Sequence, residues 1–119
     1  MNRSITILLA TALLLCSFSA TARERTYQMT WCAANNGTAE VVLSDGTRVD
    51  CVTATHAVEV DFAPKWAEAI GQALHYALIT GKRPGILLIV GPTDNANVDR
   101  LKRTIDGLCL HIDVWTVQR

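Results

Sequence analysis

The chain has no excess charge of either sign. Its 119 residues carry 11 Lys and Arg against 11 Asp and Glu, so the formal net charge at pH 7 is zero. This balance excludes the strongly basic composition of proteins that bind nucleic acid tightly and generally. The sequence also lacks internal repeats, linkers and low-complexity tracts, so we expect one folding unit.

Cysteine is scarce, and its spacing argues against a zinc site. None of the four cysteines forms a Cys-x-x-Cys pair, and no His pair lies nearby. Three of them, Cys32, Cys51 and Cys109, follow the first 22 residues. We expect one disulfide and one leftover thiol, with Cys32–Cys51 and Cys51–Cys109 both open as pairings. The alternative is that all three are small buried hydrophobic residues.

The sequence also lacks an apolar run long enough to span a membrane. Residues 5–15 are apolar apart from Thr and small residues, far short of the roughly 20 that a spanning helix needs. Arg3 precedes this run and Ala20-Thr21-Ala22 follows it as a cleavage site. Residues 1–22 are therefore predicted to be a signal peptide. Residues 23–119 would form a single exported domain, periplasmic or secreted, with no membrane attachment after cleavage.

Hydrophobic periods and turn residues predict eight elements in the exported part. They are a helix at 26–34 (strand being the alternative), strands at 41–43, 47–53 and 57–62, a helix at 64–80, a buried strand at 85–90, a helix from Asp94 or Asn95 through Leu108, and a strand at 111–117. Their order, α-β-β-β-α-β-α-β, predicts an α/β fold. The predicted core comprises Val58, Val60, Phe62, Ile70, Leu74, Leu78 and residues 86–90.

Acidic residues around the third predicted strand carry the functional signal. Glu59 and Asp61 are two residues apart, so they share one face of that strand. Asp50 lies on the preceding strand, and Gln72 and Tyr76 are four residues apart on the following helix. The alternative is that the three carboxylates decorate a solvated sheet face.

In order and spacing these residues resemble the motifs of the PD-(D/E)xK nuclease superfamily, RecB-like branch, over roughly residues 38–90. The resemblance implies a restriction-endonuclease-like core, a mixed β-sheet flanked by helices. It implies that Asp50 and Glu59 are metal ligands. Gln72 and Tyr76 match the helix motif that positions the substrate, and Glu40 is a candidate for an additional upstream acid.

One position departs from the family motif. Asp61 stands where the family has lysine, so Asp61 becomes an additional candidate ligand and Lys65 the candidate replacement for the lysine. The expected cofactor is Mg²⁺ or Mn²⁺, which prefers hard oxygen ligands. The expected reaction is hydrolysis of nucleic-acid phosphodiester bonds. The alternative is an inactive exported binding domain on the same scaffold, with a protein partner.

The remaining basic cluster is interpreted as an ordinary helix surface. Arg100, Lys102 and Arg103 lie on the second long helix, interrupted by Asp99 and Asp106. The three tryptophans, which are far apart in sequence, are expected in the core or at its edge.

Overall fold

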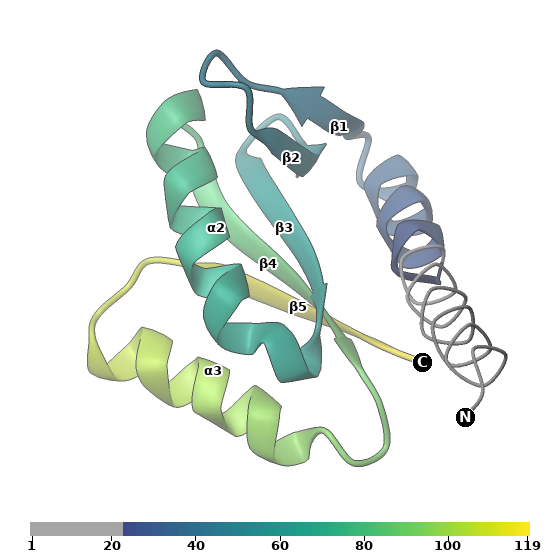
Figure 1. The fold of residues 1–119 in the computed structure, drawn as a ribbon, viewed down its shortest axis with the longest axis vertical. Helices are drawn as coiled ribbons and strands as arrows, with labels where there is room; N and C mark the ends of the chain where they lie inside the picture. Colours follow the sequence, from purple (N-terminus) through teal and green to yellow (C-terminus); the bar gives the residue numbers. More distant parts are fainter. Residues whose placement is uncertain (1–22) are drawn as a thin grey trace, which may run out of the picture.

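A computed structural model of the protein describes residues 23–119, and the predicted signal peptide lies outside these residues. The protein is an α/β domain whose five-stranded mixed sheet is flanked by three helices (Figure 1). After an N-terminal helix at residues 23–34 come β1 (Thr38–Val42), β2 (Arg48–Val52), β3 (His56–Phe62), the 3₁₀ turn η1 (Ala63–Lys65), α2 (Trp66–Thr80), β4 (Arg83–Val90), α3 (Asn95–Gly107) and β5 (Asp113–Gln118). The predicted element order is confirmed.

The strands lie side by side in chain order. β1, β2 and β3 form an antiparallel meander, while β3, β4 and β5 are parallel. The two parallel connections place α2 and α3 on one face of the sheet (Figure 1). The N-terminal helix packs on the opposite face through Tyr27 and Trp31. In the described part of the chain, no helix is long and apolar enough to cross a membrane.

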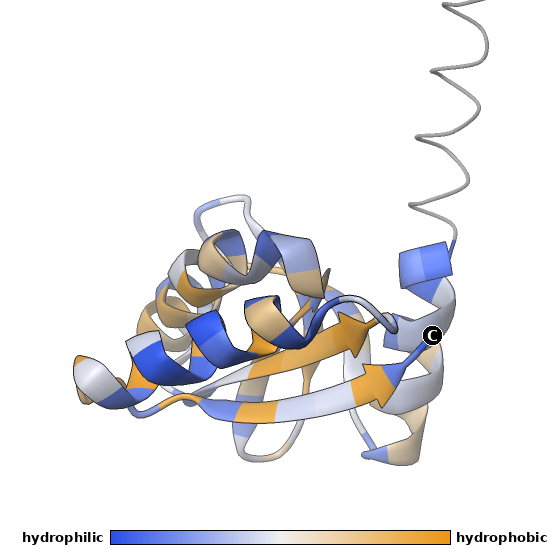
Figure 2. Ribbon diagram, turned by 90° about the horizontal axis from the view of Figure 1, so that it is seen from below, coloured by the Kyte–Doolittle hydropathy of each residue, from blue (hydrophilic) through white to orange (hydrophobic). Residues whose placement is uncertain are grey.

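β4 is the central strand, and it is buried on both faces as predicted. Ile86 and Leu88 pack under α2 and α3, whereas Leu87 and Ile89 pack toward the N-terminal helix. All four side chains are fully buried. The strands accordingly carry the strongest hydrophobic colour in Figure 2, whereas α3 alternates hydrophobic positions with strongly hydrophilic ones.

Helix α2 begins and ends where the sequence indicates, but it buries a different face from the one predicted. Pro64 lies in the turn that leads into it, and Gly81 ends it at φ 69°, a left-handed conformation that glycine adopts without strain. The predicted core residues Leu74 and Leu78 are 38% and 79% exposed. The residues buried instead are Ala69, Ala73 and Tyr76.

The physical reason is that two adjacent stripes on this helix are apolar, and the sheet selects between them. Small residues allow the helix to lie close to β3 and β4, so Ala69 and Ala73 face the sheet.

Of the other predicted core residues, Phe62 and Ile70 are only partly buried. Val58, Val60 and residues 86–90 are buried, as predicted.

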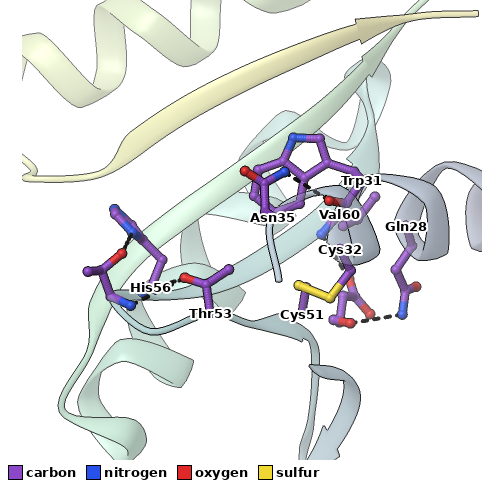
Figure 3. The surroundings of a disulfide bond; sticks show 10 residues. Gln28, Trp31, Cys32, Asn35, Cys51, Thr53, His56 and Val60 are labelled. Carbon is purple, nitrogen blue, oxygen red and sulfur yellow. Dashed lines mark hydrogen bonds between the residues drawn. A yellow bond between two sulfur atoms is a disulfide. The ribbon is translucent and has the colours of Figure 1, made fainter. Parts of the chain in front are cut away.

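A disulfide joins the N-terminal helix to β2 (Figure 3). It links Cys32 to Cys51, and Cys109 is a free, exposed thiol. One disulfide and one leftover thiol are therefore confirmed, while the reading with three buried thiols is wrong. A Cβ on Gly37 would lie 2.5 Å from the sulfur of Cys51 and 2.7 Å from that of Cys32, so only glycine fits beside the bridge.

Candidate functional site

The carboxylates of β3 lie inside the protein and not on a solvated face. Glu59 and Asp61 are each 5% exposed. In the parallel ladder they pair with Ile86 and Leu88, so they lie on the face that α2 covers. The interpretation of these acids as surface decoration is therefore wrong. Buried carboxylates are costly unless they are paired, protonated or bound to a cation.

Asp50 occupies the place where β2 separates from β3. The last paired residue on this side of the ladder is Cys51, opposite Val58. One residue further, the backbone N–H of Val60 donates to Oδ2 of Asp50 at 2.8 Å, so a side chain replaces the backbone carbonyl of a neighbouring strand. This hydrogen bond holds the Asp50 carboxyl group beside Glu59.

Asp50 and Glu59 form a coupled acidic pair. Burial, followed by the negative charge of Asp50, raises the pKa of Glu59 far above its usual range. Glu59 therefore stays protonated, and its O–H group donates a hydrogen bond to the Asp50 carboxylate. Burial raises the pKa of Asp50 too, opposed by the N–H of Val60 and the bond from Glu59. The other oxygen of Glu59, Oε2, is buried and has no hydrogen-bond partner among the described residues.

Sequence analysis missed one acid of this cluster, Glu24. Burial, followed by the charges of Asp61 and Asp50, raises its pKa to about 7. One helical turn later, the amide of Gln28 donates to the backbone oxygen of Asp50 at 3.0 Å (Figure 3). The i, i+4 spacing of Glu24 and Gln28 was the available signal. It was lost because the helix was predicted to begin at Thr26.

Lys65 contributes positive charge near this cluster. Burial raises the pKa of Asp61 to about 6, and the charge of Lys65 is the largest influence that lowers it. The same lysine lowers the pKa of Glu24. Oδ1 of Asp61 also accepts the N–H of Phe62 at 2.9 Å. Among residues 23–119, no ion pair within 4.0 Å joins Lys65 to either carboxyl group, so its charge acts from a longer distance.

Glu40, the expected additional acid, lies at the edge of the cluster, where its charge raises the pKa of Asp50. Its Oε1 is 3.1 Å from Nη1 of Arg25, and its Oε2 is 3.9 Å from Nη1 of Arg48. Its φ of 55° places it in a left-handed conformation within β1. Glu24 is a second upstream acid of the cluster, because the helix packs back against the point where β2 and β3 separate.

The Gln72 and Tyr76 pair lies above the carboxylates on α2. The Gln72 side chain lies close enough to the Tyr76 hydroxyl group to lower its pKa. Burial, then the charges of Glu59 and Asp50, raise the pKa of Tyr76. Tyr76 is buried against Val49 and Ala57, so its ring is part of the core while its hydroxyl group faces the acids.

The donor types fit a hard divalent cation, although the side chains are not arranged as a ready metal cage. Within residues 23–119, no three His, Cys, Asp or Glu side chains form such a group. In this state Asp50 and Asp61 accept backbone N–H groups, and Glu59 holds a proton. The side chains supply oxygen donors of the type that Mg²⁺ and Mn²⁺ bind, and the unpartnered Oε2 of Glu59 is one of them.

Comparison with protein-family models, curated proteins and solved structures gives no match for this chain.

Proposed function

We propose that this protein is an exported Mg²⁺- or Mn²⁺-dependent hydrolase of nucleic-acid phosphodiester bonds with a restriction-endonuclease-like fold. The observation that carries the proposal is the cluster around Glu59. The charges of Asp50, Asp61 and Glu24 raise the pKa of Glu59, and the positive charge of Lys65 acts on Asp61 and Glu24. A structural role explains this cluster poorly, because several buried acids of like charge destabilise the fold.

Each residue has a proposed part in the reaction. Asp50, Glu59 and Asp61 would hold the cation, which supplies positive charge to the phosphate and lowers the pKa of a bound water. Lys65 would offset the negative charge that develops on the phosphate oxygens as water attacks phosphorus and the P–O bond breaks. Gln72 and Tyr76 would position the substrate or the acids beneath them.

Export is part of the proposal. The Cys32–Cys51 disulfide is compatible with an oxidising compartment, the periplasm or the outside of the cell. The predicted signal peptide at residues 1–22 would provide the route.

A second candidate is an exported binding domain that has lost its chemistry. Asp61 favours it, because a carboxylate at this position adds negative charge where the family has lysine. The absence of a ready metal cage among residues 23–119 points in the same direction. Its partner would be a protein.

The test is cleavage together with metal binding. Purified, oxidised protein is incubated with labelled single-stranded DNA, duplex DNA and RNA, with Mg²⁺, with Mn²⁺ or with EDTA. We expect cleavage with either cation and none with EDTA, and a loss of at least about 100-fold in Asp50→Ala and Glu59→Ala. If calorimetry detects no cation binding and all the nucleic acids stay intact, the hydrolase proposal is rejected in favour of the binding domain.

A further inference from the structure

A hollow of about 260 Å³ lies between the start of α2 and the middle of α3. We call it the Trp66 notch. Its lining residues are Trp66, Arg100, Arg103 and Thr104. Arg100 and Arg103 are three residues apart, so their side chains lie on one face of α3.

The notch lies at the same end of the sheet as the carboxylates. Trp66 directly follows Lys65, whose charge acts on Asp61 and Glu24. Helices α2 and α3 both follow the carboxyl ends of parallel strands, β3 and β4.

The notch presents two guanidinium groups that have no carboxylate partner among residues 23–119. Arg103 makes no ion pair or hydrogen bond with any residue in the range 23–119. Arg100 forms no ion pair there either, and donates from Nη1 to Asn97 at 3.2 Å. The hydroxyl group of Thr104 donates to the backbone oxygen of Arg100 at 2.8 Å. Two guanidinium groups without a carboxylate partner leave a site for an anion with several oxygens.

We propose that the Trp66 notch binds one nucleotide of a single-stranded nucleic acid, with its phosphate between Arg100 and Arg103 and its base stacked on Trp66. The inference rests on the proposed nuclease function and adds the substrate class. An indole ring stacks on any base, so the site binds without reading sequence. A paired base lies inside the duplex and would have to leave the stack to reach the indole, which selects single strands.

Another hollow of similar size lacks this chemistry. It lies between the end of the N-terminal helix and β5, lined by Trp31, Trp115 and His56 among others. Its polar side chains already have hydrogen-bond partners within the protein. His56 Nε2 lies 2.6 Å from Asp113 Oδ2, and His56 Nδ1 lies 2.7 Å from the hydroxyl oxygen of Thr55. The unpaired arginines therefore single out the Trp66 notch.

The test is binding of a fluorescein-labelled 12-nucleotide oligo(dT) to the purified protein, measured by fluorescence anisotropy in EDTA, where cleavage is not needed. We expect Arg103→Ala and Trp66→Leu each to weaken binding by about tenfold. Leucine keeps an apolar side chain where Trp66 packs on the core, and thermal unfolding confirms that each variant is folded. Lys102→Ala is the matched control, because it removes the same charge from the same helix outside the notch, and we expect less than about a twofold change.

A 12-base-pair duplex is the second arm. We expect it to bind more weakly and to respond to Arg103→Ala but not to Trp66→Leu, since only the phosphate contact remains. If the folded Arg103→Ala and Trp66→Leu proteins bind the single strand as tightly as wild type, the proposal that the Trp66 notch binds a nucleotide is wrong. An equal response of the duplex to Trp66→Leu would overturn its selectivity.

The two proposals fail in different ways. Suppose that cleavage depends on Asp50 and Glu59, while Arg103→Ala leaves oligonucleotide binding and KM unchanged. This result would support the nuclease proposal and reject the proposal that the Trp66 notch binds a nucleotide. Binding that depends on Arg103 and Trp66, without cleavage by Mg²⁺ or Mn²⁺, would retain the notch as a nucleic-acid site and remove the nuclease.

Discussion

At the scale of single residues, Glu59 combines a functional opportunity with a cost in stability. It is buried beside Asp50, and one of its oxygens has no partner in the described part of the chain. We expect Glu59→Gln to raise Tm by about 5 °C at pH 8, because a neutral amide donates to Asp50 without having to retain a proton. The measurement is thermal unfolding without divalent cations. The control is Glu68→Gln on exposed α2 surface, which should leave Tm nearly unchanged.

The same substitution should abolish any stabilisation by Mg²⁺, because it removes a charged ligand. A Glu59→Gln protein that is less stable than wild type at pH 8 would contradict the inference that the buried carboxyl group of Glu59 destabilises the fold.

Lys65 is the candidate replacement for the catalytic lysine, because Asp61 stands at the position where the family motif has that lysine. We expect Lys65→Ala to lower kcat by about 100-fold while KM for the oligonucleotide changes little, because its charge would act on the transition state. Calorimetry should still detect cation binding. The matched control is Lys82→Ala, a lysine that follows the far end of α2 and donates to the backbone oxygen of Ala54. Equal losses in both variants would argue against a specific role for Lys65.

At the scale of elements, the disulfide fastens the helix that carries Glu24 to the strand that carries Asp50. The bridge between Cys32 and Cys51 closes a loop of 19 residues. We expect the double variant Cys32→Ser, Cys51→Ser to lose about 3 kcal/mol of unfolding free energy, measured by urea titration.

Cys109→Ser is its control and should unfold like wild type, since that thiol is exposed and unpaired. The double variant should also lose activity at temperatures where it remains folded, because Glu24 and Gln28 are then less firmly held. Unchanged stability would show that packing of Tyr27 and Trp31 alone fixes the helix.

At the scale of the whole molecule, the acid cluster should make stability fall as pH rises. The pKa values of Asp61 and Glu24 are raised to about 6 and about 7, so the folded protein holds protons that the unfolded chain has released. Stability from these groups is complete below about pH 4 and is lost as pH rises through about 7, a decrease on the order of 2 kcal/mol.

Thermal unfolding between pH 4.5 and 8 checks this dependence. Mg²⁺ should restore stability at pH 8 and have little effect at pH 4.5, where protons already occupy the carboxylates. Glu59→Gln serves as the reference, with a shallower decrease. Stability that rises from pH 4.5 to pH 8 in the absence of cations would contradict a buried cluster of acids.

The sequence by itself determined the order and type of the elements. The Asp45-Gly46 turn, Pro64 before α2, Gly81 after it and the uniformly apolar residues of β4 are local signals that depend on backbone conformation and hydrophobic period. The same alternation placed Glu59 and Asp61 together on one face of β3, and the hairpin placed Asp50 on the neighbouring strand.

Only the tertiary structure decided which surfaces meet. It buried Ala69 and Ala73 in place of Leu74 and Leu78, paired Cys32 with Cys51, and added Glu24 to the acids. These outcomes depend on how closely segments far apart in sequence approach one another. Periodicity fixes the faces of a single helix or strand, but the packing of the helices on the sheet determines which face is buried and which charges become neighbours.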